Sequence, residues 1–384
     1  MDWILLLEWL IKSLVLIFAL LGGFAYLTWY ERKVLSRMQV RYGPNRAGKF
    51  GLLQPIADAV KLIFKEELIP DQAEKILFII APIVTVVPAV VITATVPWGP
   101  SFVAFGRTIN LYIANIDVAV LYVTAIAAIA VYGIVLAGWS SNNKYAMLGG
   151  LRSTAQMVSY ELALGLSFVT VILLAGSMNM LAIVEAQKSI WFAVIQPTGA
   201  VIFLIATLAE LNRAPFDMPE AEQELTAGYH VEYSGMKFAL FFMAEYTKMI
   251  AIAAIAATLF FGGYREPWFL KDTFLSVDYT WAWGFSNWFL GPVYIFLKIV
   301  VLLFGMIWVR ATLPRIRYDR LMSFGWKAIL PLSLAVVLIS ALGIALREIN
   351  PWLIWLVPVV SIFIGLVTVG LVDRSLRRKV YATR

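Results

Sequence analysis

Ionisable side chains occur inside stretches of this sequence that are otherwise apolar. Glu161, Glu245, Lys248 and Lys298 lie within such stretches, and Glu210 ends another. A charge near the centre of a bilayer costs about 2.5–3.5 kcal/mol on insertion scales, so several of them need a reason. One interpretation is structural, because Glu245 and Lys248 are three residues apart and could neutralise each other on one helix face. The interpretation we favour is a proton or ion relay, in which neighbouring carboxylates share protons.

A second group of charges forms an acidic segment at 210–235. Its acids are Glu210, Asp217, Glu220, Glu222, Glu224 and Glu232. Arg213 is the one arginine or lysine among them. A solvated acidic loop is one possibility, but Pro215, Phe216 and Pro219 favour a fixed, partly buried structure. For His230 we expect a surface or capping position rather than a ligand role.

Two basic segments flank apolar stretches. The first runs from Trp29 through Arg32 to Arg46, and the second contains Arg310, Arg315, Arg317 and Arg320. Such segments can anchor to anionic lipid, dock a soluble partner or form the mouth of a cavity. They also serve as topology markers.

Several chemistries have no candidate residues in the sequence. With no cysteine and a single histidine, thiolate-held iron–sulfur clusters, structural zinc sites and bis-histidine haem are excluded. No P-loop, GxSxG or histidine-rich metal pattern is present. Any redox cofactor must therefore be held by another chain or be a diffusible organic molecule.

The composition predicts how these charges are positioned. Of 384 residues 61% are hydrophobic and 14% charged, and the mean hydropathy is +0.82. Because a bilayer core needs about 20 apolar residues per helix, we predict an all-α, polytopic transmembrane bundle, one membrane domain over 1–384. The nine expected spans are about 5–29, 76–97, 117–139, 155–176, 191–209, 236–262, 291–313, 328–347 and 351–372.

Two further features concern the membrane surface. Between the first two spans, 50–67 has polar residues three or four apart and apolar residues opposite, which predicts an interfacial amphipathic helix. The first span lacks a basic n-region and a cleavage site, so we expect a retained helix.

The lysines and arginines predict the orientation of the chain. Most of the 31 fall inside if the N-terminus is outside and the C-terminus cytoplasmic. We find no case for nucleic-acid binding.

The order and spacing of several motifs resemble one family, the membrane subunit of respiratory complex I, the bacterial NADH:quinone oxidoreductase. The resemblance covers roughly 26–331. The matching stretches are Glu31-Arg32-Lys33, Arg41-Tyr42-Gly43-Pro44-Asn45, Gly51-Leu52-Leu53-Gln54-Pro55 with Ala57-Asp58, Asn212-Arg213-Ala214-Pro215-Phe216-Asp217, Glu232-Tyr233, Met243-Ala244-Glu245-Tyr246 and Pro314-Arg315-Ile316-Arg317-Tyr318-Asp319.

The resemblance implies a place at the joint between the electron-transfer arm and the membrane arm, in the cell inner (plasma) membrane. The chain would form most of a tunnel for a lipid quinone, while FMN and iron–sulfur clusters would lie in soluble partner subunits. The implied tunnel residues are Arg32, Asp58, Arg213, Phe216, Asp217, Arg310, Arg315 and Arg317. The implied start of a carboxylate path toward antiporter-like membrane subunits is Glu161, Glu210, Glu245, Glu220, Glu222 and Glu224.

Some expectations stay open beside that resemblance. Lys298 matches an embedded lysine of the family and is expected as the electrostatic partner of the path, whereas Lys248 balances Glu245 and Lys12 snorkels outward. The ninth span departs from the many relatives with eight. A membrane-bound hydrogenase subunit, an independent secondary transporter and a pure scaffold are the alternatives, and the quinone type and the electron donor remain undetermined.

Overall fold

The structure is a computed structural model, and it describes residues 3–104, 107–217, 228–271, 273, 275–277 and 287–382. It is a helical bundle, as the sequence predicts. The long helices are α1 (Trp3–Met38), α3 (Lys75–Val91), α4 (Ala119–Ser140), α5 (Lys144–Ala175), α10 (Gly235–Phe260), α11 (Leu290–Thr312), α13 (Leu330–Ile349) and α14 (Leu356–Ala382).

Shorter elements connect these helices. The short α-helices are α2 (Gln54–Ile63), α6 (Met180–Ala186), α7 (Phe192–Ile195), α8 (Pro197–Glu210) and α12 (Tyr318–Phe324). Single turns are η1 (Lys49–Gly51), η2 (Ile92–Thr95), η3 (Gly228–His230), η4 (Trp268–Leu270), the π-helical η5 (Gly325–Ile329) and η6 (Pro351–Trp355). Strands β1 (Phe102–Ala104) and β2 (Arg107–Ile109) pair as an antiparallel hairpin.

Among the described residues, eight helical segments are long and apolar enough to cross a membrane. The all-α, multi-pass prediction is therefore confirmed, but the expected count of nine differs in one place. The stretch predicted at 191–209 is broken at Gln196, where φ is −128° and ψ is 64°, and Pro197 begins a new helix. That helix, α8, has 14 residues and is about 21 Å long, which is short of an apolar core of about 30 Å.

Two helices extend well beyond their predicted limits. Helix α1 continues past 29 to Met38, and α5 begins at Lys144 rather than near 155. The apolar sequence ends where a helix leaves the membrane. The backbone hydrogen bonds of the helix can continue beyond that point. The extension of α1 places Glu31 on a rigid helix instead of a loop.

The predicted interfacial helix is present but shorter than 50–67. Its regular part, α2, has Pro55 in its first turn. The apolar side chains Ile56, Val60, Ile63 and Phe64 are exposed, in keeping with a helix whose apolar face meets lipid.

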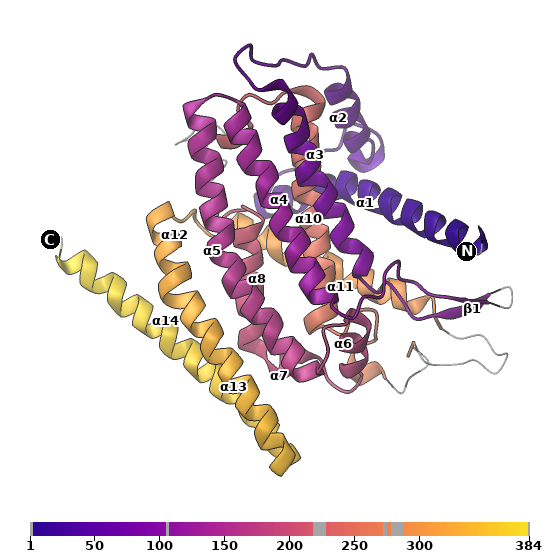
Figure 1. Ribbon diagram of the computed structural model, residues 1–384, viewed down its shortest axis with the longest axis vertical. Coiled ribbons are helices and arrows are strands. Elements are labelled where there is room, and N and C mark those ends of the chain that lie inside the picture. Colours follow the sequence, from indigo (N-terminus) through magenta and orange to yellow (C-terminus); the bar gives the residue numbers. More distant parts are fainter. Residues whose placement is uncertain are drawn as a thin grey trace.

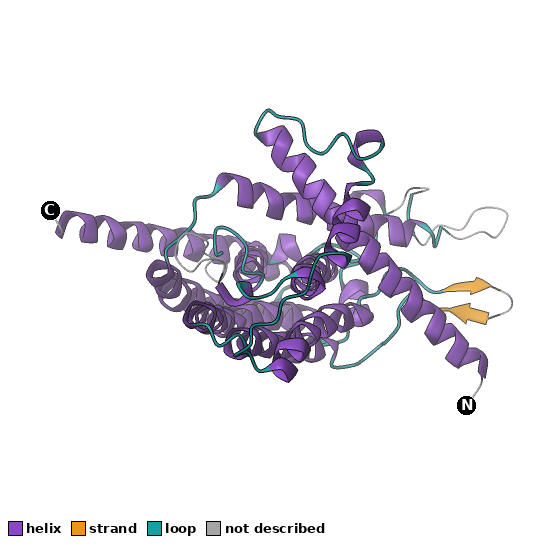
Figure 2. Ribbon diagram, turned by 90° about the horizontal axis from the view of Figure 1, so that it is seen from above, coloured by secondary structure: helices purple, strands orange, loops and turns teal. Residues whose placement is uncertain are grey.

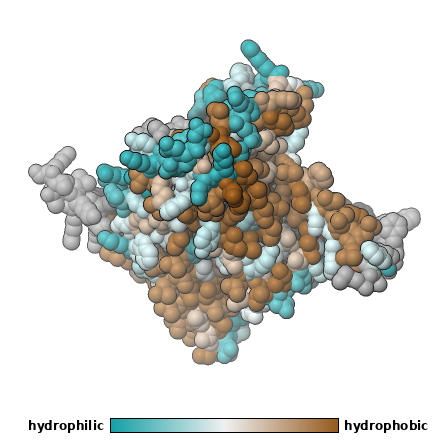
Figure 3. All heavy atoms as spheres, turned by 45° about the horizontal axis from the view of Figure 1, so that its top comes forward, coloured by the Kyte–Doolittle hydropathy of each residue, from teal (hydrophilic) through white to brown (hydrophobic). Residues whose placement is uncertain are grey.

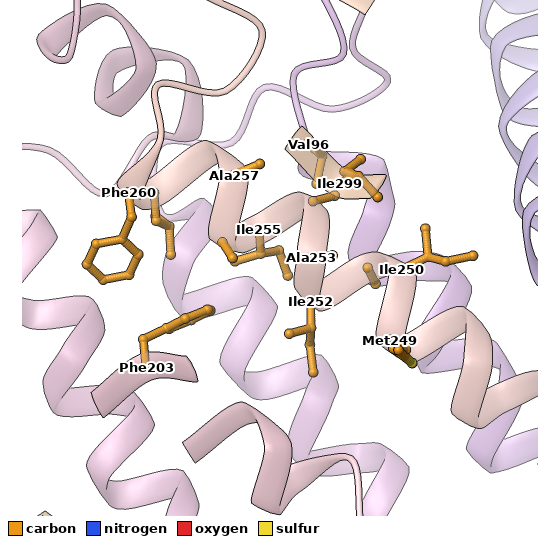
Figure 4. Packing of buried hydrophobic residues seen from close by; sticks show 14 of the residues in the cluster. Val96, Phe203, Met249, Ile250, Ile252, Ala253, Ile255, Ala257, Phe260 and Ile299 are labelled. Carbon is orange, nitrogen blue, oxygen red and sulfur yellow. The ribbon is translucent and has the colours of Figure 1, made fainter. Parts of the chain in front are cut away.

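Helix α10 is the centre of the bundle. Every residue from Tyr246 to Phe260 is buried. The many alanines between Ala251 and Ala257 let neighbouring helices approach closely, as in other membrane bundles. Figure 4 shows this packing, with Phe203 of α8 and Ile299 of α11 beside α10.

The two ends of the chain lie at the margins of the bundle. In Figures 1 and 2, α1 runs out toward the N-terminus on one side, and α14 runs out toward the C-terminus on the other. Only 6% of the most apolar window of α1 is buried, and 11% of that of α14. Polar residues gather at one end of the face in Figure 3, and apolar residues cover much of the rest. Such an apolar exterior suits a protein surrounded by lipid.

Candidate functional site

Arg213 is the centre of a buried ionic group. It lies just after α8, and its Nη1 donates to Glu31 Oε2 of α1 at 2.8 Å. Its Nε donates to Glu245 Oε1 of α10 at 2.5 Å. The guanidinium also stacks over the ring of Tyr246, 4.2 Å from the ring centroid. One arginine therefore bridges two carboxylates that come from different helices.

A second arginine extends this group toward the edge of the bundle. Arg310, at the end of α11, donates from Nη1 to Glu31 Oε1. The Glu31 side chain is 4% exposed, whereas that of Arg310 is 38% exposed. The charges thus alternate from Arg310 through Glu31 and Arg213 to Glu245. We call these four residues the arginine–carboxylate series.

A further ion pair lies beside the series. Lys248 Nζ is 2.9 Å from Glu210 Oε1 at the end of α8. Lys248, Glu210 and Glu161 of α5 line one small cavity of about 20 Å³. A cavity needs about 10–15 Å³ by such a measure to hold a water molecule, so one water fits between these groups.

These contacts correct two expectations about the embedded charges. Lys248 does not balance Glu245, because Lys248 pairs with Glu210 and Glu245 pairs with Arg213. Lys298 is not the partner of the carboxylates either. Its Nζ donates to the backbone oxygens of Gly263 at 2.8 Å and of Arg265 at 2.6 Å.

Lys298 belongs to a second charged group, which lies near the C-terminal end of α10. Its ammonium lies 5.0 Å from the centroid of the Trp191 ring. Arg265 Nη2 donates to Glu185 of α6. Buried Glu266 accepts from the Ser276 hydroxyl at 3.0 Å and from the Val277 amide. We call Lys298, Arg265, Glu185 and Glu266 the loop cluster, since it fixes the segment after α10.

The segment that carries Arg213 is held in place by a buried amide. Gln156 of α5 donates from Nε2 to the backbone oxygens of Ala209 at 2.7 Å and Phe216 at 2.8 Å. Asn212, with a positive φ of 51°, donates to the Ser153 hydroxyl at 3.0 Å. The position of Arg213 is therefore set by α5, and the expectation of a fixed, partly buried segment holds for the described part, up to 217.

The remaining residues assigned to the tunnel fall into two places. Arg32 Nη1 of α1 donates to Asp58 Oδ2 of α2 at 2.7 Å, and both side chains are part-exposed. Phe216 is buried against Tyr160, and Asp217 follows it. The Ile316 amide donates to the Pro215 oxygen at 3.1 Å, which joins the two segments.

The basic segment itself reaches the surface. Arg315 and Arg317 are exposed, and Arg317 Nε lies 3.4 Å from Asp319 Oδ2. Glu220, Glu222 and Glu224, which were expected to contribute to the carboxylate path, lie outside the described residues.

The segment 228–234 contains the single histidine. His230 is half-buried, and its ring packs against those of Tyr229 and Phe238. Burial lowers its pKa to about 4. Burial likewise raises the pKa of Tyr233 to about 12, while its hydroxyl faces Ser140 Oγ at 3.4 Å. Both rings are therefore neutral near pH 7 and act in packing.

Three side chains at the site had no role assigned from the sequence. Glu31 was recognised only as part of a motif, Tyr246 likewise, and Gln156 not at all. The sequence feature that could have identified them is their residue type, because an acid, a tyrosine and an amide each lie in an apolar stretch. Lys12 also gains a partner, because it donates to Glu8 one turn earlier in α1 instead of only snorkelling.

The fold and the buried charges define the class of protein: a multi-pass helical membrane protein with ionic groups linked across several helices. The family model for NADH dehydrogenase matches residues 11–341. A relative from Rhodospirillum rubrum, named as the H subunit of NADH-quinone oxidoreductase, is 50% identical over 86% of this chain and 92% of its own length. One from Syntrophobacter fumaroxidans, named as an H subunit of the same enzyme, is 45% identical over 90% of this chain and 96% of its own length.

The chain therefore belongs to the NADH dehydrogenase family, as the motifs suggested. It is a membrane subunit of an NADH-quinone oxidoreductase complex and not an enzyme by itself. Its partners are other subunits of that complex. All of α14 lies beyond the stretch that the family model matches, which ends at residue 341.

Proposed function

We propose that this chain forms most of the passage by which a lipid quinone reaches the electron-transfer arm, and the start of the carboxylate path that couples quinone reduction to proton translocation. The observation that carries the proposal is the arginine–carboxylate series. It leads from the half-exposed Arg310 to Glu245 inside α10. FMN and iron–sulfur clusters would be held by the soluble partner subunits, which supply the electrons.

The shared arginine gives a physical route for coupling. Reducing a quinone to a quinol takes up two electrons and two protons, and negative charge develops before the protons arrive. Negative charge near Arg310 would draw its guanidinium away from Glu31. Arg213, bonded to Glu31 and Glu245 together, would then be held more strongly by Glu31, and protonation of Glu245 would be favoured. A local charge change is thereby converted into a proton movement.

The path continues to the second ion pair. Glu245 and Lys248 are three residues apart on α10, and Lys248 pairs with Glu210. The cavity beside them offers room for one water between Glu210 and Glu161. We infer that a proton passes from Glu245 toward Glu210 and Glu161, with Lys248 balancing the charge. Beyond Glu161 the path would enter antiporter-like partner subunits, with Glu220, Glu222 and Glu224 contributing from the acidic segment.

The passage for quinone is inferred from the polar side chains at the membrane edge. Arg32 and Asp58 join α1 to the interfacial helix α2. Arg315 and Arg317 lie exposed on the segment that bonds to Pro215. A passage between lipid and the soluble arm needs apolar walls for the tail and charged groups at its polar end, and these side chains would supply the charged groups. Asp217 and Phe216 would lie along the same passage.

The relay is tested with Glu245→Gln in the whole complex. We expect quinone-coupled proton pumping to fall by about tenfold or more, because a glutamine at this position can neither take up nor release a proton and meets Arg213 without a charge. NADH oxidation with an artificial acceptor should stay intact. The matched control is Glu185→Gln in the loop cluster, which should pump normally. Normal pumping by the Glu245 variant would remove Glu245 from the path.

The passage is tested with Arg32→Ala and Asp217→Ala. Both should raise the KM for quinone and weaken inhibitors that compete with it, while artificial-acceptor activity is unchanged. An unaltered quinone titration would place both residues outside the passage.

We also propose the orientation with the N-terminus outside and the C-terminus cytoplasmic, in the bacterial inner membrane. It requires that α7 and α8 cross together despite the break at Gln196. A reporter fused at the C-terminus should be protected from protease added to intact cells. Cleavage in intact cells would mean that this segment does not cross.

A further inference from the structure

A long apolar groove runs between α1 and α11. It encloses about 730 Å³. The walls come from α1 between Ile11 and Tyr30 and from α11 between Pro292 and Leu303, with Ile250 of α10 at its base. Along α1 the groove covers about 28 Å of helix axis, close to the thickness of a bilayer core of about 30 Å.

The two ends of the groove differ from its middle. At one end lie Lys12, Asn110 and Tyr112, and at the other lie Tyr26 and Tyr30. Tyrosine, tryptophan and lysine side chains are the ones that settle at the headgroup level of a membrane. The groove therefore has an apolar body bounded by two interfacial ends.

Cations continue the groove past its Tyr30 end. Tyr26, Tyr30, Lys33 and Arg37 are spaced four, three and four residues apart on α1, so they share one helix face. Lys33 Nζ lies 5.9 Å from the centroid of the Trp29 ring, which itself lines the groove. The positive charges of Lys33 and Arg37 thus lie at headgroup level, directly beyond the apolar walls of the groove.

We propose that this groove holds the acyl chains of an anionic phospholipid, whose phosphate meets Lys33 and Arg37. The volume of the groove, about 730 Å³, lies within the range of small-molecule sites, about 300–1,000 Å³, and suits narrow acyl chains better than a whole helix about 10–12 Å across. The charge decides against a quinone tail, because an uncharged quinone head gives the two cations nothing to bind. The lipid would fill the space between α1 and the bundle.

The site is tested on the purified whole complex with phosphatidylglycerol that carries a photoactivatable group in an acyl chain. Adducts should map to the groove-lining residues of α1 and α11. Ala19→Trp places a large side chain in the groove and should reduce labelling of α11 several-fold. The matched control is Leu14→Trp, which adds the same ring more than one turn earlier on an exposed position outside the groove, and should leave labelling unchanged.

The headgroup contact is tested separately. Lys33→Gln and Arg37→Gln should each reduce the preference for phosphatidylglycerol over phosphatidylcholine by about fivefold. Arg46→Gln, an exposed arginine off this helix face, should leave the preference intact.

Three results would overturn the proposal. The first is labelling of Leu14 and Phe18 as strong as that of the groove. The second is capture of another subunit by a photo-crosslinker placed at Ala19. The third is displacement of the labelled lipid by a long-chain quinone.

Discussion

Two separate groups of buried charges lie along α10 and α11, and they hold their charges in different ways. In the arginine–carboxylate series each charged side chain faces another, so that Arg213 is shared between Glu31 and Glu245. In the loop cluster Lys298 instead donates to two backbone oxygens. Glu245 lies 15 residues before Phe260, the last residue of α10, which is about 22 Å along the helix, and Gly263 and Arg265 follow that end. The two groups are therefore well separated along α10.

The difference teaches what a buried charge can do. An arginine that bonds two carboxylates can be held more strongly by one of them or by the other. A change of charge at one carboxylate therefore alters how strongly the arginine is bound to the second. A lysine tied to backbone oxygens has one arrangement, since those oxygens neither titrate nor move independently of the segment. The first group suits a proton relay. The second suits a structural role, in which it holds the segment after α10 in place; we call this role a clamp.

The largest effect is expected for Arg213→Met. It leaves Glu31 and Glu245 without their shared partner, and breaking a buried pair in this way costs about 3–5 kcal/mol. We expect poor assembly of the complex, measured by native gel electrophoresis, and loss of quinone reductase activity. Arg317→Ala, which breaks an exposed pair, is the control for assembly. Normal assembly and pumping by the Arg213→Met variant would end the case for a relay centred on this arginine.

Lys248→Met should have the next largest effect. It leaves the buried Glu210 carboxylate unpaired beside the small cavity. Glu210 would then take up a proton and hold it, so we expect proton pumping per electron to fall by about tenfold. Lys248→Arg, which keeps the charge, should restore part of it. The measurement is proton uptake in proteoliposomes against the rate of NADH oxidation.

The sequence predicts the positions of the membrane helices better than it predicts the partners of the buried charges. Hydropathy locates the membrane helices, because length and apolar composition are local properties. It misplaces the ends of α1 and α5, where polar residues continue a helix beyond the membrane, and it misses the break at Gln196. The partners of the charges are not local at all: Glu31 and Arg213 are 182 positions apart. Pairing by proximity in sequence therefore gave Lys248 the wrong partner.

Lys298→Met directly tests the difference between the loop cluster and the arginine–carboxylate series. We expect a smaller effect than that of Lys248→Met. Two backbone oxygens lose their donor, which costs about 1–3 kcal/mol and should lower the melting temperature of the complex. The number of protons pumped per electron should not change, in contrast to the Lys248 variant. A fall in pumping as large as that of Lys248→Met would show that the loop cluster belongs to the relay.

Glu185→Gln should have the smallest effect. The Glu185 side chain is 47% exposed although its partner Arg265 is buried, and pairs with an exposed member contribute only about 0–1 kcal/mol. The glutamine oxygen can still accept from Arg265 and from the Tyr264 hydroxyl, which bonds Glu185 at 3.0 Å. We expect a melting temperature within a few degrees of the parent protein and unchanged pumping. Because Glu185 and Glu245 both pair with a buried arginine, a loss of pumping in both glutamine variants would mean that pairing with arginine does not by itself distinguish a relay carboxylate from a clamp.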